Sequence, residues 1–310
     1  MGPLSATAFE AVAAKLRASA GMAAKADIGL AAARLGLSGA DAIPVGDDCA
    51  AIPDGDGFLL FAIEGFMNEF VAGDPWFAGW CGVMVNLSDI AAMGGRPVAV
   101  VDAVWAKGED GAAPVLEGLR AASERFGVPL VGGHTNLKTD RGQLSVAVLG
   151  RAKRLLTSFD ARPGETLVAA IDLRGRYREP FPNWEAATDA PAARLRGDLE
   201  LLPMIAEAGL SRAAKDISQG GIVGTAAIEL ARWLMSFPSY GYLLSAAPDD
   251  VPAIFSLFEA RGIAAAAIGS VTADRRVTVT NGGARETIWD FSQRPLLGCG
   301  PPPRRSEDAA

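Results

Sequence analysis

The first half of the chain alternates between extended apolar runs and segments with helical periodicity. Runs rich in β-branched and aromatic residues, bounded by Gly, Pro or charged residues, predict strands over Phe58–Ile63, Val98–Trp105 and Leu144–Leu149. Between these runs the pattern predicts two helices, roughly Phe77–Met93 and Ala112–Phe126, and Gly127 is placed to end the second. Alternation of strands and helices in this order is typical of an α/β or α+β domain.

An Ala-rich segment precedes these elements, from about Ala6 to Leu37. Lys and Arg are spaced through it, as in an exposed helix, and Ser19-Ala20-Gly21 interrupts the pattern. Two helices joined by small residues therefore fit this segment best.

The second half follows a basic stretch, Arg151–Arg162, that leads into the turn Ala161–Glu165. A strand over Thr166–Ile171 and a loop rich in Pro and Trp from Arg174 to Pro191 are predicted next. Further predicted elements are helices over Ala192–Ala208 and Gly221–Leu234, strands over Tyr242–Ser245, Ala265–Val271 and Val277–Thr280, and a disordered tail, Pro301–Ala310. A domain boundary is expected in the basic stretch.

Composition places the chain among folded globular proteins. Half of its 310 residues are hydrophobic and 21% are charged, which is enough apolar surface for two buried cores. The formal net charge of −7 and the lack of a long basic run argue against nucleic-acid binding, which depends on clustered Lys and Arg. We find no apolar run long enough for a transmembrane helix, and no targeting signal, and therefore expect a protein that does not act on a membrane. The cysteine usage described next favours a reducing, cytoplasmic location.

Cysteine and histidine usage narrows the possible chemistry. The three cysteines, Cys49, Cys81 and Cys299, are far apart and form no CxxC pair, so neither a disulfide framework nor a thiolate zinc site is indicated. His134 is the single histidine, which excludes sites that need two imidazoles from one chain. Any metal ion must be held mostly by oxygen atoms.

Four short segments place a carboxylate or the histidine beside glycines and other small residues. Carboxylates suit magnesium, and glycines let the backbone approach phosphates closely, so the segments together suggest a magnesium–nucleotide site. Each also has a purely structural interpretation: paired Asp residues after Gly often form a turn or cap, and a histidine between Gly-Gly and Thr-Asn can be a hydrogen-bonded turn residue. The four segments are Gly46–Ala50, Asn86–Gly95, Gly132–Asn136 and Asp216–Gly221.

In their order along the chain these segments resemble the PurM-like superfamily, which includes aminoimidazole ribonucleotide (AIR) synthetase, thiamine-monophosphate kinase, selenophosphate synthetase and a hydrogenase maturation factor. The matching strings are GDDCAAI from Gly46, NLSDIAAMGGRP from Asn86, GGHT from Gly132, ARPGE from Ala161 and DISQGG from Asp216. The chain looks most like an AIR synthase-related branch of unknown substrate.

The resemblance implies a two-domain fold, with an N-terminal ATP- and magnesium-binding domain over residues 1–152 and a C-terminal domain over 153–310. It also implies a homodimer in which the sheets of two N-terminal domains pair, and a small-molecule substrate. The implied magnesium ligands are Asp47, Asp48, Glu64, Asp89 and Asp216. The implied nucleotide-binding residues add Asn86, Gly132, Gly133, His134, Thr135, Ser218 and Gln219 to Asp47, Asp48, Asp89 and Asp216.

The chain departs from the kinases at two motifs, since His134 and Gln219 stand where thiamine-monophosphate kinases carry Asp. A histidine there resembles selenophosphate synthetases, but the cysteine expected before Lys25 is missing, which disfavours selenide chemistry. His134 is a candidate phosphate or substrate contact. Lys25 is a candidate phosphate-contacting lysine, with a solvated surface lysine as the simpler interpretation.

Two functions remain open from the sequence. The first is ATP- and magnesium-dependent phosphoryl transfer to a small molecule, either as a kinase or to activate an amide or carboxylate oxygen. The second is an ATP-binding scaffold or maturation partner with reduced catalysis, because two metal-binding charges are missing at His134 and Gln219.

Overall fold

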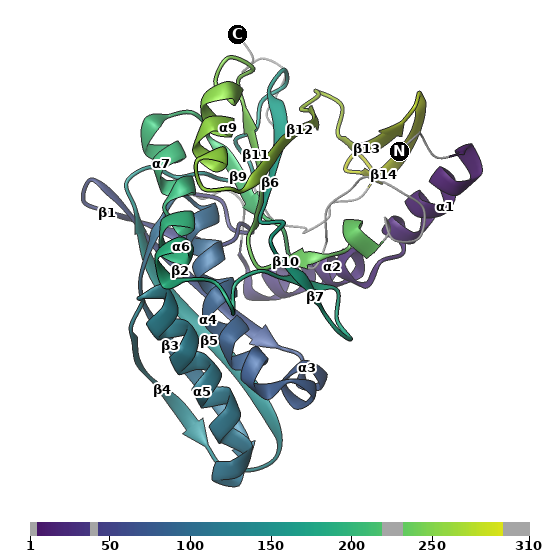
Figure 1. The fold of residues 1–310 in the computed structure, drawn as a ribbon. Coiled ribbons are helices and arrows are strands. Elements are labelled where there is room, and N and C mark those ends of the chain that lie inside the picture. Colours follow the sequence, from purple (N-terminus) through teal and green to yellow (C-terminus); the bar gives the residue numbers. More distant parts are fainter. Residues whose placement is uncertain (1–4, 38–42, 219–231, 294–310) are drawn as a thin grey trace.

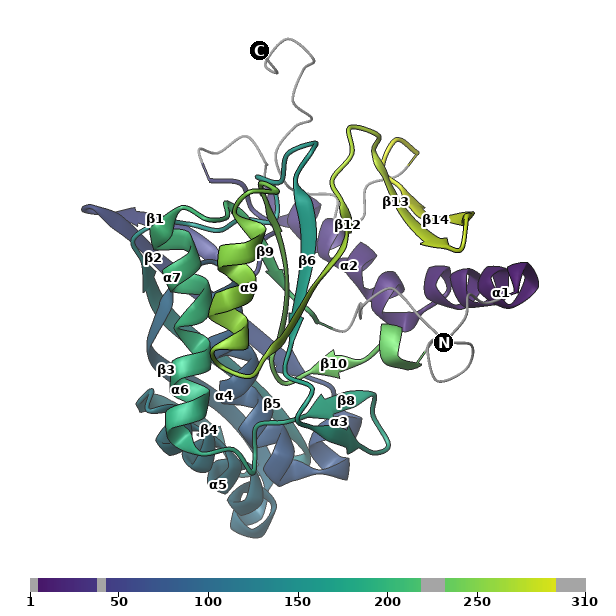
Figure 2. The same cartoon turned by 45° about the horizontal axis from the view of Figure 1, so that its top comes forward.

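The computed structural model describes residues 5–37, 43–218 and 232–293, and it leaves the side chains of residues 20–26 undescribed. Within this part of the chain the protein is a mixed α/β structure. A five-stranded sheet and a four-stranded sheet lie on either side of a central group of helices (Figures 1 and 2). No helix among the described residues has the length and apolar character needed to cross a membrane.

The first sheet has the strand order β1-β2-β5-β3-β4. Neighbouring strands run antiparallel, except that β3 and β4 are parallel, and helix α5 makes the crossover between them. The elements of this half are β1 (Ala50–Asp54), β2 (Gly57–Phe66), α3 (Asn68–Gly73), α4 (Pro75–Ala92), β3 (Arg96–Lys107), α5 (Gly108–Phe126), β4 (Leu130–Asn136) and β5 (Lys138–Ala152). The three predicted strands and two predicted helices are present, and Gly127 ends α5 with a φ of 74°.

Helix α4 lies between the first sheet and the elements of the second half (Figure 1). Nearly every side chain from Phe77 to Ala92 is buried, which explains why this helix is apolar all round. Its close packing against α5 depends on glycine: a Cβ on Gly118 would come within 1.9 Å of the Trp76 carbonyl oxygen. The helix begins at Asp74, which accepts a bond from the Phe77 N–H at 3.3 Å and another from Arg178 Nε at 2.8 Å.

The second sheet is entirely antiparallel, in the order β12-β6-β11-β9. Its elements and covering helices are β6 (Thr166–Ile171), α6 (Ala192–Leu199), α7 (Leu201–Ala208), β9 (Ala213–Asp216), β11 (Gly241–Ala246), α9 (Val251–Glu259) and β12 (Ala264–Ser270). The single helix predicted over Ala192–Ala208 is therefore two helices, which meet at Glu200. Arg96 joins the halves through ion pairs with Glu200 at 2.7 Å and Glu207 at 2.6 Å.

The predicted loop from Arg174 to Pro191 is wrong in part, because it contains the short strands β7 (Arg176–Arg178) and β8 (Asn183–Glu185), which form a small sheet with β10 (Phe237–Pro238). The two predicted N-terminal helices are confirmed as α1 (Ala6–Arg17) and α2 (Ala20–Leu35). A hairpin of β13 (Arg276–Asn281) and β14 (Ala284–Asp290) packs on α1. Most of the predicted helix Gly221–Leu234 and the tail Pro301–Ala310 lie outside the described residues.

The buried core is continuous between the halves and includes Leu60 on β2 and Phe258 on α9. Strand β5 ends at Ala152 and β6 begins at Thr166, on either side of the predicted boundary. The division into domains 1–152 and 153–310 stays a prediction.

Candidate magnesium and nucleotide site

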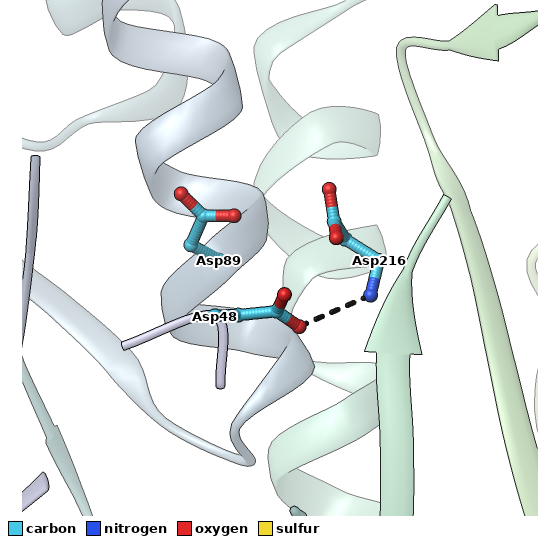
Figure 3. Close-up of side chains that lie close together, drawn as sticks. All are labelled: Asp48, Asp89 and Asp216. Atoms are coloured by element: carbon cyan, nitrogen blue, oxygen red, sulfur yellow. Dashed lines mark hydrogen bonds between the residues drawn. The ribbon is translucent and has the colours of Figure 1, made fainter. Parts of the chain in front are cut away.

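Three carboxylates from distant parts of the sequence meet between the two halves (Figure 3). Asp48 lies in the loop before β1, Asp89 in the last turn of α4, and Asp216 at the end of β9. One oxygen from each lies within 4.8 Å of the others. We call Asp48, Asp89 and Asp216 the carboxylate cluster.

Asp89 is placed where a negative charge is costly. It is only 5% exposed, and its Oδ2 is buried without a hydrogen-bond partner among the described residues. The last turn of a helix also presents the negative end of the helix dipole. Burial, followed by the neighbouring charges of Asp216 and Asp48, raises the pKa of Asp89 well above its ordinary value. A cation among these oxygens would remove the penalty, and carboxylate oxygens are the ligands that magnesium prefers.

Asp48 is held in place from β9 through both of its oxygens. Its Oδ2 accepts the backbone N–H of Asp216 at 3.2 Å, as Figure 3 shows, and its Oδ1 accepts a short hydrogen bond from Lys215 Nζ. The ammonium of Lys215 also lies 3.9 Å from Asp216 Oδ1. Burial alone would lower the pKa of Lys215, but Asp48 and Asp216 outweigh it and raise that pKa, which favours the charged ammonium.

Asp47 and Glu64 lie beside the carboxylate cluster but are not members of it. Asp47 accepts bonds from the Ser158 N–H at 2.8 Å and the Ser158 hydroxyl at 2.7 Å, and so ties its loop to the chain after β5. Burial and the charge of Asp48 raise the pKa of Asp47. Glu64 on β2 is half-buried, and its charge contributes to the raised pKa of Asp89. Metal ligation by either residue stays a prediction.

Asn86 and Ser218 lie next to cluster residues along the chain. Asn86 precedes Asp89 by three residues on α4, so the two side chains share one face of the helix. Its Nδ2 donates to the Gly82 carbonyl at 2.8 Å, while its buried Oδ1 has no hydrogen-bond partner in the described residues. Ser218 is half-buried and follows Asp216 by two residues. The side chain of Lys25 and the whole of Gln219 lie outside the described residues.

The motif Gly132–Thr135 forms strand β4 at the edge of the first sheet, not a loop. Gly133 lies opposite Asp102, which lies opposite Val146, which lies opposite Glu64, so one cross-strand row joins β4 to β2. Three strand spacings separate the ends of this row, or about 14 Å at ~4.8 Å each. The four motif residues are therefore not brought to the carboxylate cluster within one chain.

The side chain of His134 faces away from α4. Val146 is buried, and a Cβ on Gly133 would lie 2.4 Å from Asp102 Oδ1, so the row occupies the face of the sheet that α4 covers. Successive residues of a strand point to opposite faces, which places His134 on the open face. Its ring lies 5.9 Å from that of Trp105 on β3.

Comparison with known proteins identifies the fold and the family. The family model "AIR synthase related protein, N-terminal domain" matches residues 46–152. An uncharacterised protein of Synechocystis sp. is 44% identical over 92% of this chain and 96% of its own length. An uncharacterised protein of Methanocaldococcus jannaschii is 34% identical over 72% of this chain and 77% of its own. The chain belongs to the AIR synthase-related family.

More distant similarities are to proteins with named activities. The thiamine-monophosphate kinase of Pyrococcus abyssi is 30% identical over 57% of this chain and 59% of its own. Among solved structures, T. maritima PurL complexed with ATP superposes with a TM-score of 0.65 at 19% identity, over 83% of this chain. AaThiL complexed with AMPPCP and TMP gives a TM-score of 0.53 at 20% identity, over 71% of this chain. The chain spans about half of the PurL chain (47%) and most of the AaThiL chain (84%).

The AIR synthase-related segment 46–152 contains Asp48 and Asp89 but ends before Asp216. Lys215 and Ser158 also lie beyond it, and sequence reasoning missed both residues. Lys215 directly precedes the DISQGG motif, which was the one signal available for it. Ser158 carried no signal, because only the folded chain brings it to Asp47.

Proposed function

We propose that the protein binds ATP with magnesium and transfers a phosphoryl group to a small molecule. The observation that carries this proposal is the carboxylate cluster with the buried, unpartnered Oδ2 of Asp89. The Lys215 ammonium balances only part of the negative charge of the three carboxylates, and the remainder favours a bound divalent cation. The named relatives support the nucleotide part, since they include kinases and proteins solved with ATP, ADP or AMPPCP bound.

The chain's own residues supply ligands and orientation in this proposal. Asp48, Asp89 and Asp216 hold the magnesium ion, and the backbone N–H of Asp216 fixes the orientation of the Asp48 carboxylate. Glu64 and Asp47 add negative charge next to the cluster. A magnesium ion bound there neutralises phosphate charge during transfer, which is most of what phosphoryl transfer requires of a protein.

We further propose a homodimer that uses the open face of the first sheet. Large apolar side chains are exposed on its strands, including Phe61 at 50% and Ile63 at 67% on β2. Contiguous exposed apolar surface of this kind marks an interaction face. His134 lies on this face, so in the dimer it would meet the second copy and not the cluster of its own chain. Cys49 and Cys81 are buried and free, which fits a cytoplasmic location.

Heat unfolding with magnesium and ATP together, and with each alone, tests the nucleotide site. At about 100 times its dissociation constant, the pair should stabilise the fold by about 2.7 kcal/mol. No shift at millimolar concentrations would contradict the proposal. ADP release is then measured with amides, carboxylates and phosphorylated heterocycles as acceptors.

A catalytically reduced ATP-binding scaffold is the second candidate. The placement of His134 away from the cluster favours it, since no charge at the third motif reaches the magnesium site within one chain. Binding of magnesium and ATP without ADP release across all acceptor classes would support this candidate.

A further inference from the structure

The ammonium group of Lys215 lies among the carboxylates that are proposed to bind magnesium. Its ammonium bonds Asp48 Oδ1 and lies 3.9 Å from Asp216 Oδ1, so it contacts two of the three carboxylates of the cluster. The carboxylates are nearly inaccessible, with side-chain exposures of 4% for Asp48 and 6% for Asp216. The lysine is thus the internal cation of the cluster.

A divalent ion on Asp48 would meet this ammonium at close range. Asp48 Oδ2 accepts the Asp216 N–H and Oδ1 accepts from Lys215, so an ion bound to Asp48 would share a single carboxylate with the ammonium. Two cations on one carboxylate repel each other strongly at the low dielectric of a partly buried site. Occupation by the ion therefore favours movement of the lysine away from Asp48.

The lysine has room to move, and a nucleotide would give it a new partner. Its side chain is 31% exposed, and its flexible four-carbon chain can carry the ammonium outward while its backbone remains in β9. An ammonium released from a carboxylate needs another anion, and the phosphates of a nucleotide bound at the same ion provide one.

We propose that Lys215 is an exchangeable cation, which neutralises the carboxylate cluster in the free protein and moves from Asp48 to the phosphates when magnesium and nucleotide bind. This inference rests on the proposed nucleotide site. It makes Lys215 a ligand-binding residue that couples metal binding to nucleotide binding. It also explains how the buried carboxylates of Asp48 and Asp216 are tolerated before either ligand arrives.

Binding of Mn²⁺ without nucleotide, measured by electron paramagnetic resonance, tests the competition directly. Lys215→Met removes the competing charge, so it should bind Mn²⁺ at least about tenfold more tightly than the wild type. Lys215→Arg keeps the charge and should resemble the wild type. The control is Lys107→Met, which changes an exposed lysine on β3. Equal or weaker Mn²⁺ binding by Lys215→Met would overturn the proposal.

The opposite change is expected for Mg²⁺ with a non-hydrolysable ATP analogue. Here Lys215→Met should bind more weakly than the wild type, by about tenfold, because it lacks the phosphate contact. A purely structural lysine would weaken both kinds of binding together. Tighter or unchanged analogue binding by Lys215→Met would therefore count against the phosphate contact.

A measurement on the wild type avoids dependence on how well the variant folds. An amine-acylating reagent, with the modified sites mapped by mass spectrometry, should modify Lys215 faster after Mg²⁺ alone and more slowly after Mg²⁺ with the analogue. Lys107 should react equally in all states. An unchanged rate at Lys215 would refute the exchange. If the analogue binds but Lys215 does not respond, only this inference fails; if the wild type binds neither metal nor analogue, the proposed function fails with it.

Discussion

Asp216 donates its backbone N–H to Asp48 Oδ2 across 3.2 Å, so the strand that contributes one carboxylate also orients another. The whole of the first sheet and helices α3 to α7 lie between the two residues along the chain. The cluster therefore exists only when both halves are folded against each other. Changes at the carboxylate cluster should therefore alter the free energy of unfolding of the whole protein.

Asp89→Asn should raise stability in the absence of ligands and abolish stabilisation by magnesium with ATP. The amide carries no charge, so the cost of burying an ionised group beside Asp216 and Asp48, about 1–3 kcal/mol, is relieved, while the cluster loses one of its three carboxylates. Urea unfolding with and without the ligands measures both effects. Asp56→Asn, at a highly exposed carboxylate, is the control and should retain the ligand effect.

Gly118→Ala should destabilise the packing of α4 against α5 by about 1–3 kcal/mol. The added Cβ would meet backbone atoms, at 1.9 Å from the Trp76 oxygen and 2.9 Å from the Trp80 nitrogen, and backbone cannot rotate away. Gly111→Ala is on the same helix, where the nearest atom is 3.8 Å from the new Cβ. That control should be neutral or slightly stabilising, and equal destabilisation by both changes would refute the explanation. Thermal unfolding distinguishes the two variants.

Glu207→Gln should reduce stability at neutral pH but not in acid. The bond from Arg96 lowers the pKa of Glu207 from its ordinary value, so the ionised carboxylate stabilises the fold at neutral pH, and the gain is lost as the pH falls through the lowered pKa. The pair is partly exposed, which limits the difference to about 0.5–1 kcal/mol. Urea unfolding from pH 7 down to about 3 should show the variant and the wild type converging. Glu117→Gln, at an exposed site on α5, should show no such convergence.

Phe61→Asp should give a monomer without loss of fold. Phe61 is half exposed on the open face of β2, so a charge there disturbs no packed core but opposes apolar association of two sheets. Sedimentation equilibrium of the wild type and the variant compares their masses. Leu116→Asp, on the covering helix α5, should leave the mass unchanged. A monomeric wild type would contradict the proposed dimer.

The sequence predicted those elements whose hydrophobic pattern is strong and local. Strand Thr166–Ile171 has the predicted bounds, α5 ends at Phe126 before Gly127 as predicted, and α4 ends one residue before the predicted Met93. Strand β4 was missed because Gly132 and Gly133 are poor strand formers, and its pairing with β3 spans the whole of α5. The break at Glu200 lies between Gly197 and Pro203, two signals that the prediction of a single helix did not use.

The sequence predicted those site residues that lie within a recognisable motif. Asp48, Asp89 and Asp216 were all selected from the sequence, and the structure brings them together. Lys215 was not selected, because strand alternation would direct it away from Asp216; its length and flexibility allow the ammonium to reach Asp48 instead. Motif spacing does not report which side of a sheet His134 faces, and only the register of β3 with β4 decides it.

Helix α4 connects the segment around Arg178 to the carboxylate cluster. Its first turn is anchored through Asp74 to Arg178 on β7, in a segment whose Pro- and Trp-rich sequence departs from the family motifs, and its last turn carries Asp89. A buried helix of 18 residues behaves as a stiff rod, about 27 Å long. We expect a displacement at the Arg178 end to move Asp89 as well, because the helix between them is buried along its length. Substitutions in the Arg178 segment should therefore affect the carboxylate cluster without touching it.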